Sequence, residues 1–384
     1  MSKRPLIMAW QPVLTDHVAY VLDALGKAAD ADFETIAVTH TQVERVKQGW
    51  QPLGVDHLNP TILSRNKWIG QVVEILRRQP DTIHLFCGPF GDLRITLALL
   101  AALAWRRKVY VVSEPYSPSA TGYLEDGNRY IISVKAKVRP LIYKLFGIAL
   151  RNRVAGVFAI SPLANLQYRE MGLPEQAIHP FGYFVPTPDT PQLEPAQSGV
   201  SAAGLKLCFV GSLISRKGLH DLIQATRSVA AVGLSVSLDV YGSGDPSKYD
   251  VDGSTVKYCG VIPFGTASTV IAGYHALVVP SEHDGWAVVV NEALTAGVPV
   301  IVSKNVGASA MVEKFDCGIV YDPQKHDALQ DALTRVAASS DYLAGLRDAT
   351  QVLKPLLQPD VAGRYMRDVI FGDAEPDCPW YDYP

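Results

Sequence analysis

The stretch HALVVPSEHDGWAVVVNEALTAGVPVIVS, residues 275–303, decides the fold. It opens as a short apolar strand, passes through the loop EHDG at 282–285 into a helix predicted at 286–295, and closes in a second apolar strand at 298–303. A glycine and a proline separate the helix from the second strand, as is typical of a helix end. Two unbroken apolar strands joined by a helix indicate a parallel sheet that is covered on both faces.

The same alternation extends through most of the chain. It predicts strands at 5–10, 33–40, 82–88, 108–114, 155–161, 177–181, 205–211, 235–242, 255–262, 275–281 and 298–303, with helices between them, for example at 16–29 and 163–171. The predicted fold class is therefore α/β, with two Rossmann-like βα domains facing across a cleft. Ligands of such sheets bind beyond the carboxyl ends of the strands, so we expect the site between the domains.

One segment interrupts this alternation. Residues 186–204 are rich in Pro, Ser, Gly and Ala and have no apolar periodicity, which indicates a linker. The predicted organisation is an N-terminal domain over 1–185, the linker, a C-terminal domain over 205–358, and a closing helix and tail over 359–384 that packs back towards the N-terminal domain.

The composition limits the class of protein. The chain has 384 residues, of which 48% are apolar and 19% charged, and its formal net charge of -3 argues against a general nucleic-acid binder. Its five cysteines form no CxxC pair, which favours a reducing cytoplasm over a disulfide framework or a zinc ribbon. The longest apolar run, at 95–105, is shorter than the roughly 20 residues that cross a bilayer. We therefore expect a cytoplasmic protein with no membrane span.

The segment VGSLISRKGLHDLIQA, at 210–225, predicts an anion site. Arg216 and Lys217 precede an amphipathic helix. Cations at a helix N-terminus are electrostatically misplaced unless an anion compensates them, and a pyrophosphate suits that position. The alternative is a solvated helix start.

Two carboxylates, Asp284 and Glu292, stand with seven residues between them. Eight residues of continuous helix would separate their backbones by about 12 Å, whereas the acid/base pairs of sugar hydrolases lie about 5–9.5 Å apart. An acid/base dyad is therefore disfavoured. The structural alternatives are that Asp284 caps the helix and that Glu292 lies on a solvated helix face, although a carboxylate among apolar neighbours is unusual on such a face.

These motifs together resemble the retaining GT-B-fold glycosyltransferases of family 4, the glycosyl transferases group 1. The family hallmark is Glu-x7-Glu after a strand that ends in Pro-Ser, followed by Ala, a glycine and Pro-Val. The matching pieces are PS at 280–281, Asp284-x7-Glu292, GVPV at 297–300, VGSLISRKG at 210–218, CGVI at 259–262 and the segment 159–185. The resemblance covers most of the chain and is strongest over 205–322.

The resemblance implies a donor site for a nucleotide-diphosphate sugar. Arg216 and Lys217 would neutralise the pyrophosphate, Glu292 would hold the ribose hydroxyls, and Asp284 would address the sugar. The remaining donor-binding residues implied are Gly211, Ser212, Val261, Ile262, Gly285, Trp286 and Ala287. This chain departs from the pattern in two places: the first motif acid is Asp, as in members that read Asp-Gly-Trp, and Ser212 stands where the family often has arginine.

The N-terminal half departs further from the family. WQPVLTDH replaces the paired-glycine loop after the first strand, and Glu114 stands where many members have histidine. Asp16, His17 and Glu114 are the acceptor-side candidates, with a helix cap or a satisfied polar residue as the alternative for each.

The implied activity is retaining, metal-independent transfer of a hexose to a hydroxyl acceptor in cell-surface polysaccharide, lipopolysaccharide or glycolipid synthesis. No cofactor is expected besides the nucleotide-sugar donor. The DxD sequence Asp30-Ala31-Asp32 lies between a helix and a strand of the other domain, and this position disfavours a metal-dependent reaction. The alternatives are a catalytically silent nucleotide-sugar-binding protein and a sugar-nucleotide epimerase on the same fold.

A basic stretch at 129–153 is interleaved with apolar residues, and no acidic residue occurs from 127 to 169. A basic amphipathic helix of this kind predicts contact with an anionic membrane, here the inner face of the plasma membrane, where the helix would give access to a lipid-linked acceptor. The alternative is a core-packed helix with a solvated basic face.

Overall fold

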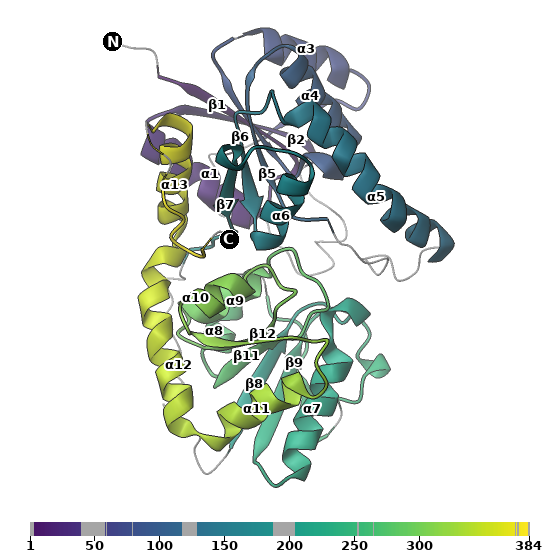
Figure 1. The fold of residues 1–384 in the computed structure, drawn as a ribbon, viewed down its shortest axis with the longest axis vertical. Helices are drawn as coiled ribbons and strands as arrows, with labels where there is room; N and C mark the ends of the chain where they lie inside the picture. Colours follow the sequence, from purple (N-terminus) through teal and green to yellow (C-terminus); the bar gives the residue numbers. More distant parts are fainter. Residues whose placement is uncertain are drawn as a thin grey trace.

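The computed structural model describes residues 4–39, 58, 60–78, 80–116, 129–186, 204–251, 253–263, 265–372, 374 and 376–382. In this part of the chain two parallel sheets lie one above the other along the long axis of the molecule, with helices packed on them (Figure 1). The predicted α/β fold with two Rossmann-like units is confirmed.

The first sheet contains seven strands and belongs to the N-terminal half. In spatial order they are β3 (Thr61–Ile62), β2 (Asp32–Thr39), β1 (Leu6–Val13), β4 (Ile83–Cys87), β5 (Lys108–Ser113), β6 (Gly156–Ile160) and β7 (Ile178–Phe181). Every neighbouring pair is parallel. β4 and β6 are buried along their whole length, as their continuous apolar sequence predicts.

The second sheet contains six parallel strands. Their order is β10 (Val256–Tyr258), β9 (Val236–Tyr241), β8 (Leu205–Val210), β11 (Ala276–Val279), β12 (Val300–Ser303) and β13 (Gly318–Tyr321). β8 pairs with β11, so the loops that follow these two strands emerge side by side at the carboxyl edge of the sheet.

Helices connect the successive strands of each sheet, and the last three follow β13. In the first half they are α1 (Asp16–Ala29), α3 (Trp68–Arg78), α4 (Leu93–Ala104), α5 (Arg129–Leu150) and α6 (Pro162–Glu170). In the second half they are α7 (Leu219–Ala231), α8 (Ala267–Ile271), α9 (Val288–Thr295), α10 (Ser309–Lys314), α11 (Ala328–Ala338), α12 (Ser340–Leu353) and α13 (Pro359–Phe371).

The C-terminal segment returns to the first half. α12 runs up the left side of Figure 1 and leads to α13, which packs on α1 so closely that a side chain at Gly363 would meet the backbone of Ala24. Beyond α13, Trp380 and Tyr381 are buried, and the Tyr381 hydroxyl accepts a hydrogen bond from the backbone N–H of Phe181 at 2.8 Å. One hydrophobic core cluster therefore contains residues of both halves.

Several boundaries differ from the sequence-based expectations. β10 ends at Tyr258, well short of the strand predicted at 255–262, and the edge strands β3 and β13 were not predicted. Short edge strands pack on one neighbour only, so their apolar signal is weak. The predicted linker at 186–204 lies outside the described residues except for its two end residues.

Candidate functional site

The candidate site is built from the loops that follow β8 and β11. The backbone N–H of Glu282 donates to the carbonyl of Arg216 at 2.8 Å, which joins the two loops directly. Gly218 adopts a left-handed conformation (φ 70°), and a Cβ there would collide with the carbonyl oxygen of Pro280. Only glycine lets the two loops approach this closely.

Arg216 and Lys217 lie in a short 3-10 turn, Ser215–Lys217, directly before α7. The Arg216 side chain is only 6% exposed; it donates to the carbonyl of His283 at 2.8 Å and lies 3.9 Å from the Asp284 carboxylate. The Lys217 ammonium donates a hydrogen bond to the same carboxylate. The alternative of a solvated helix start is therefore wrong for both cations.

Asp284 is not a helix cap. The N-cap of α9 is Ala287, whose backbone is left-handed (φ 70°, ψ 81°), so the helix begins two residues later than predicted. The backbone around Asp284 instead pairs with the segment after β12: its N–H donates to the carbonyl of Asn305 at 3.1 Å, and its carbonyl accepts from Gly307 at 3.0 Å. Since only part of the interval to Glu292 is helical, the spacing of about 12 Å that continuous helix would give does not apply.

The charges around Asp284 determine its protonation state. Burial alone would raise the pKa of its carboxyl, but the adjacent Lys217 and Arg216 outweigh burial, and the pKa is lowered from its ordinary value. Two cations and one carboxylate leave the cluster with one net positive charge. An anion that enters the site therefore meets favourable electrostatics even with Asp284 ionised.

Glu292 has a different environment. It lies in the second turn of α9, and burial raises the pKa of its carboxyl to about 7. No hydrogen bond or ion pair of its carboxylate is found among the residues that the structure describes. Its side chain is partly buried, which differs from the fully solvated helix face of the alternative. A partly buried carboxylate without a partner among the described residues is suited to accept hydrogen bonds from a ligand.

The aromatic side chain of Trp286 is structural. Its ring is buried, its Nε1 donates to the Asn291 side chain at 2.8 Å, and Asn291 donates to the carbonyl of Tyr183 at 2.9 Å. The ring also packs on Gly182 so tightly that a Cβ at that glycine would overlap it. Trp286 thus joins the second half to the end of the first, and only its backbone remains for a ligand.

The other predicted donor-side residues lie at the same edge of the sheet. Gly211 follows β8, and its N–H donates to the carbonyl of Tyr241 at 3.0 Å; Ser212 continues that loop. Val261 is 48% exposed and Ile262 partly buried, in the loop that follows β10. Gly242 N–H donates to the Gly260 carbonyl at 2.9 Å and connects this loop to the end of β9.

The three acceptor-side candidates lie in different surroundings. Glu114 follows β5 and lies against the donor-side loop, since a Cβ at Gly285 would be 2.6 Å from its carboxylate. His17 lies in the first turn of α1, within 3.1 Å of the Thr15 hydroxyl, and its ring packs edge-on against Tyr183. Asp16 is the first residue of α1, and its side chain lies outside the described residues. The structure thus brings Glu114 to the donor side and places His17 on α1, against Tyr183.

Two features of the site were missed from the sequence. His283 packs beside Arg216, and burial lowers the pKa of its imidazole. The segment Asn305–Gly307 supports the Asp284 loop, and Gly307 is so close to Gly285 and Ser161 that no side chain fits there. The glycine in KNVGAS was the available signal for a close backbone approach.

A DxD sequence at 250–252 in the second half was not predicted as a site, and its Asp250 pairs with Arg227. The DxD sequence at 30–32 is remote from the candidate site. Asp30 ends α1 and pairs with Arg4 at 2.9 Å, and Asp32 begins β2. Both lie at the amino edge of the first sheet, whereas the candidate site lies beyond carboxyl edges.

The fold is the GT-B fold, because solved structures with that architecture match nearly the whole chain. The sucrose-phosphate synthase of Thermosynechococcus elongatus superposes with a TM-score of 0.67 at 17% identity and covers 96% of this chain and 98% of that one. HepE of Anabaena, in complex with UDP and glucose, gives a TM-score of 0.67 at 12% identity. The match covers 96% of this chain and 99% of HepE.

The sequence matches cover part of the chain. Residues 204–339 match the family model described as Glycosyl transferases group 1. An uncharacterized glycosyltransferase of Methanocaldococcus jannaschii is 28% identical over 145 residues, 36% of this chain and 37% of that protein. The lipopolysaccharide glucosyltransferase WaaG of Escherichia coli is 23% identical over 159 residues, which are 40% of this chain and 42% of that protein. The matched part thus spans about two fifths of these relatives.

Proposed function

We propose that this protein is a retaining glycosyltransferase of family 4 that moves a hexose from a nucleotide-diphosphate sugar to a hydroxyl acceptor. The main support is that Arg216 and Lys217 both lie next to Asp284, where the loops after β8 and β11 meet. This cluster lies within the part of the chain that matches the glycosyltransferase family model. The relatives that act on lipopolysaccharide and capsular polysaccharide support a role in cell-surface polysaccharide, lipopolysaccharide or glycolipid synthesis.

In this proposal each group has one task. Lys217 and Arg216 neutralise the pyrophosphate, and the backbone N–H groups at the start of α9 add positive potential. Glu292 accepts hydrogen bonds from the two ribose hydroxyls. Asp284, held in place by Lys217, contacts the sugar, and the backbone around Val261 and Ile262 contacts the base.

The proposed reaction is a front-face substitution. The bond between the anomeric carbon and the phosphate oxygen breaks, and the acceptor oxygen bonds to that carbon from the same face. The acceptor proton passes to the leaving phosphate oxygen. The protein contributes position and charge stabilisation, since Arg216 and Lys217 face the negative charge that grows on the leaving group.

Product analysis separates this proposal from its alternatives. A transferase releases free sugar slowly from the donor when water replaces the acceptor. A silent nucleotide-sugar-binding protein returns the donor intact, and an epimerase returns a nucleotide sugar of altered configuration. Incubation of the purified protein with UDP-, GDP- and ADP-glucose, followed by separation of the products, decides among the three.

Metal independence is part of the proposal. Because Arg216 and Lys217 supply the positive charge at the pyrophosphate, we expect the rates of transfer and donor hydrolysis to be unchanged in excess EDTA. A loss of rate that Mg²⁺ or Mn²⁺ restores would contradict this assignment.

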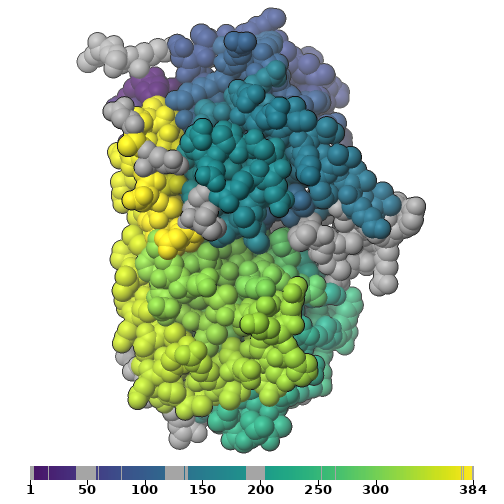
Figure 2. Space-filling view, in the orientation of Figure 1, coloured from purple at the N-terminus to yellow at the C-terminus, as the bar shows by residue number. Residues whose placement is uncertain are grey.

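We further propose that α5 docks the protein on an anionic membrane at the inner face of the plasma membrane. α5 extends from the upper half at the right of Figure 2. It exposes large apolar side chains at Val134, Val138, Leu141, Ile142, Leu145 and Ile148, each at least 43% exposed. Lys137, Arg139 and Lys144 lie among them. Exposed apolar residues beside cations suit an interfacial helix better than a solvated one. Among the described helices, none is both long and apolar enough to cross a bilayer.

Flotation with vesicles tests this surface. We expect the protein to float with vesicles that contain anionic lipid at low salt, and to lose most of that binding when Lys137, Arg139 and Lys144 are all changed to Glu. The matched control changes Lys248, Lys257 and Lys325, which are exposed on the second half, to Glu. Flotation that survives the α5 changes, or is lost equally in the control, would refute the proposal.

A further inference from the structure

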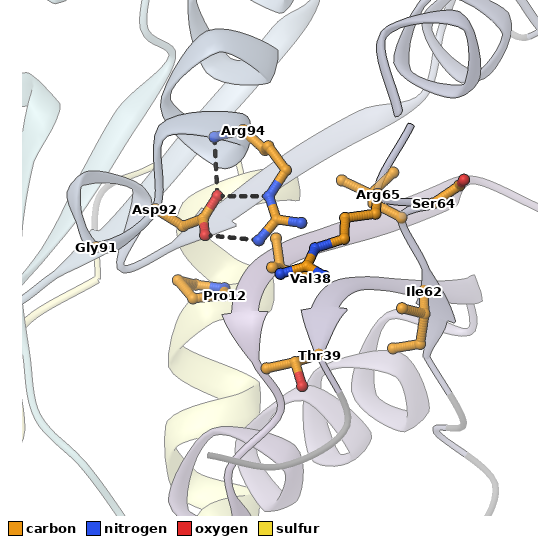
Figure 3. Close-up of a pocket in the computed structure, with 10 residues that line it drawn as sticks. Pro12, Val38, Thr39, Ile62, Ser64, Arg65, Gly91, Asp92 and Arg94 are labelled. Carbon is orange, nitrogen blue, oxygen red and sulfur yellow. Dashed lines mark hydrogen bonds and ion pairs between the residues drawn. The ribbon is translucent and has the colours of Figure 1, made fainter. Parts of the chain in front are cut away.

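A cavity of about 560 Å³ lies in the N-terminal half, at the carboxyl edge of its sheet (Figure 3). Pro12 at the end of β1, Val38 and Thr39 at the end of β2, and Arg65 after β3 form one side. Asp92 and Arg94, at the start of α4, form the other. The volume falls within the range of about 300–1,000 Å³ that is usual for small-molecule sites.

The strand order places this cavity at a switch point. From β1 the chain proceeds to β2 and β3 on one side of the sheet, and then crosses to β4 on the other side of β1. The segments that follow β1 and β4 therefore diverge and leave a crevice. Open α/β sheets bind their ligands in such a crevice.

The cavity contains a pre-positioned guanidinium. The Asp92 carboxylate accepts hydrogen bonds from the Arg94 backbone N–H at 2.8 Å, from Nε at 3.1 Å and from Nη2 at 3.0 Å. The pair is about three quarters buried, with side chains 27% and 23% exposed. A guanidinium carries five N–H donors, so Arg94 keeps donors for a ligand while Asp92 fixes its plane.

Arg65 approaches Arg94 from the opposite wall. In Figure 3 its side chain extends over Val38 towards Arg94. Within the described residues Arg65 forms no ion pair, and Asp92 is the one acid among the described residues that line the cavity. The described lining residues therefore carry one net positive charge on an otherwise largely apolar wall. Two guanidinium groups that face each other are stabilised by an anion between them.

We propose that this cavity binds an anionic group of the acceptor, a carboxylate or a phosphate on a sugar, and that Arg65 and Arg94 select acceptors that carry it. This inference rests on the proposed glycosyltransferase function and adds the chemical class of its acceptor. The cavity is distinct from the cluster around Lys217, which belongs to the other sheet and faces the donor.

Calorimetric titration with free sugars tests the assignment. We expect glucuronate, glucose 6-phosphate or both to bind the wild-type protein, and neutral methyl glucoside to bind at least tenfold more weakly, because hydrogen bonds to charged groups contribute about 1.5–3 kcal/mol each. Comparison of the two anionic sugars tells carboxylate from phosphate. Arg65→Gln and Arg94→Gln should each weaken anionic-sugar binding about tenfold or more, whereas Arg78→Gln on α3 should not.

The controls separate this inference from the proposed donor site. Arg65 is exposed, so Arg65→Gln tests the cavity even if Arg94→Gln fails to fold because Asp92 loses its partner. Equal binding of neutral and anionic sugars would overturn the proposal. So would anionic-sugar binding that disappears in Lys217→Ala and persists in Arg65→Gln, since that pattern places the anion at the donor cluster. Failure of nucleoside diphosphates to bind the wild type would refute the donor site alone.

Discussion

Lys217→Ala should lower the rate of transfer by a factor of about 10² to 10³, as loss of one preorganised charge-stabilising donor does in other enzymes. Its ammonium is the closest cation to Asp284, and the Lys217 side chain is only 18% exposed. In the proposed reaction it faces the pyrophosphate as negative charge develops there. Steady-state rates with a saturating acceptor and a range of donor concentrations measure this loss.

The same change should also reduce stability. Without Lys217 the Asp284 carboxylate is left with Arg216 at 3.9 Å, so we expect a loss of about 1–3 kcal/mol in the free energy of unfolding. Lys248→Ala, an exposed lysine of the same half, is the matched control and should change neither quantity. Transfer at the wild-type rate in a folded Lys217→Ala protein would refute the pyrophosphate assignment.

Glu292→Gln should stabilise the fold at alkaline pH while it impairs donor binding. In the folded protein the carboxyl pKa is raised from 4.5 to about 7, so the folded state holds the proton more tightly than the unfolded state. This contribution to stability is complete below the ordinary pKa and is lost as the pH rises through about 7. At pH 8 the ionised carboxylate then destabilises the fold by roughly 3 kcal/mol, and an uncharged amide removes that penalty.

Urea unfolding at pH 5 and pH 8 measures this effect. We expect the stability difference between Glu292→Gln and the wild type to be about 2–3 kcal/mol larger at pH 8 than at pH 5. The donor KM should rise about tenfold, and in the wild type it should also rise as the pH falls below about 7, where Glu292 takes up a proton. A stability difference that is the same at both pH values would show that Glu292 is solvated in the folded state.

The sequence was a good guide to the fold for a specific physical reason. Strands buried on both faces are continuously apolar, which makes runs such as IHLFC in β4 and GVFAI in β6 conspicuous. The helix predicted at 16–29 matches α1 to the residue. The short edge strands were not predicted. The start of α9 was predicted two residues too early, because Ala287 adopts a left-handed conformation that an alanine does not indicate.

The site was predictable only in parts. Arg216, Lys217, Asp284 and Glu292 stand in recognisable segments, but the pairing of Lys217 with Asp284 depends on β8 lying next to β11. Local sequence does not predict which strands are neighbours in a sheet. The arginine cavity was not predicted for the same reason, since Arg65 and Arg94 line one cavity only because β2 and β4 lie on opposite sides of β1.

Thermal unfolding with nucleotide-diphosphate sugars tests the donor site most directly. At a hundred times its dissociation constant, a ligand of the folded state stabilises the protein by about 2.7 kcal/mol. We predict that one of UDP-, GDP- and ADP-glucose stabilises the wild type to this extent in EDTA, and that Lys217→Ala loses most of this stabilisation. Absence of stabilisation by all three, or equal stabilisation of the wild type and Lys217→Ala, would contradict a donor site at the loops after β8 and β11.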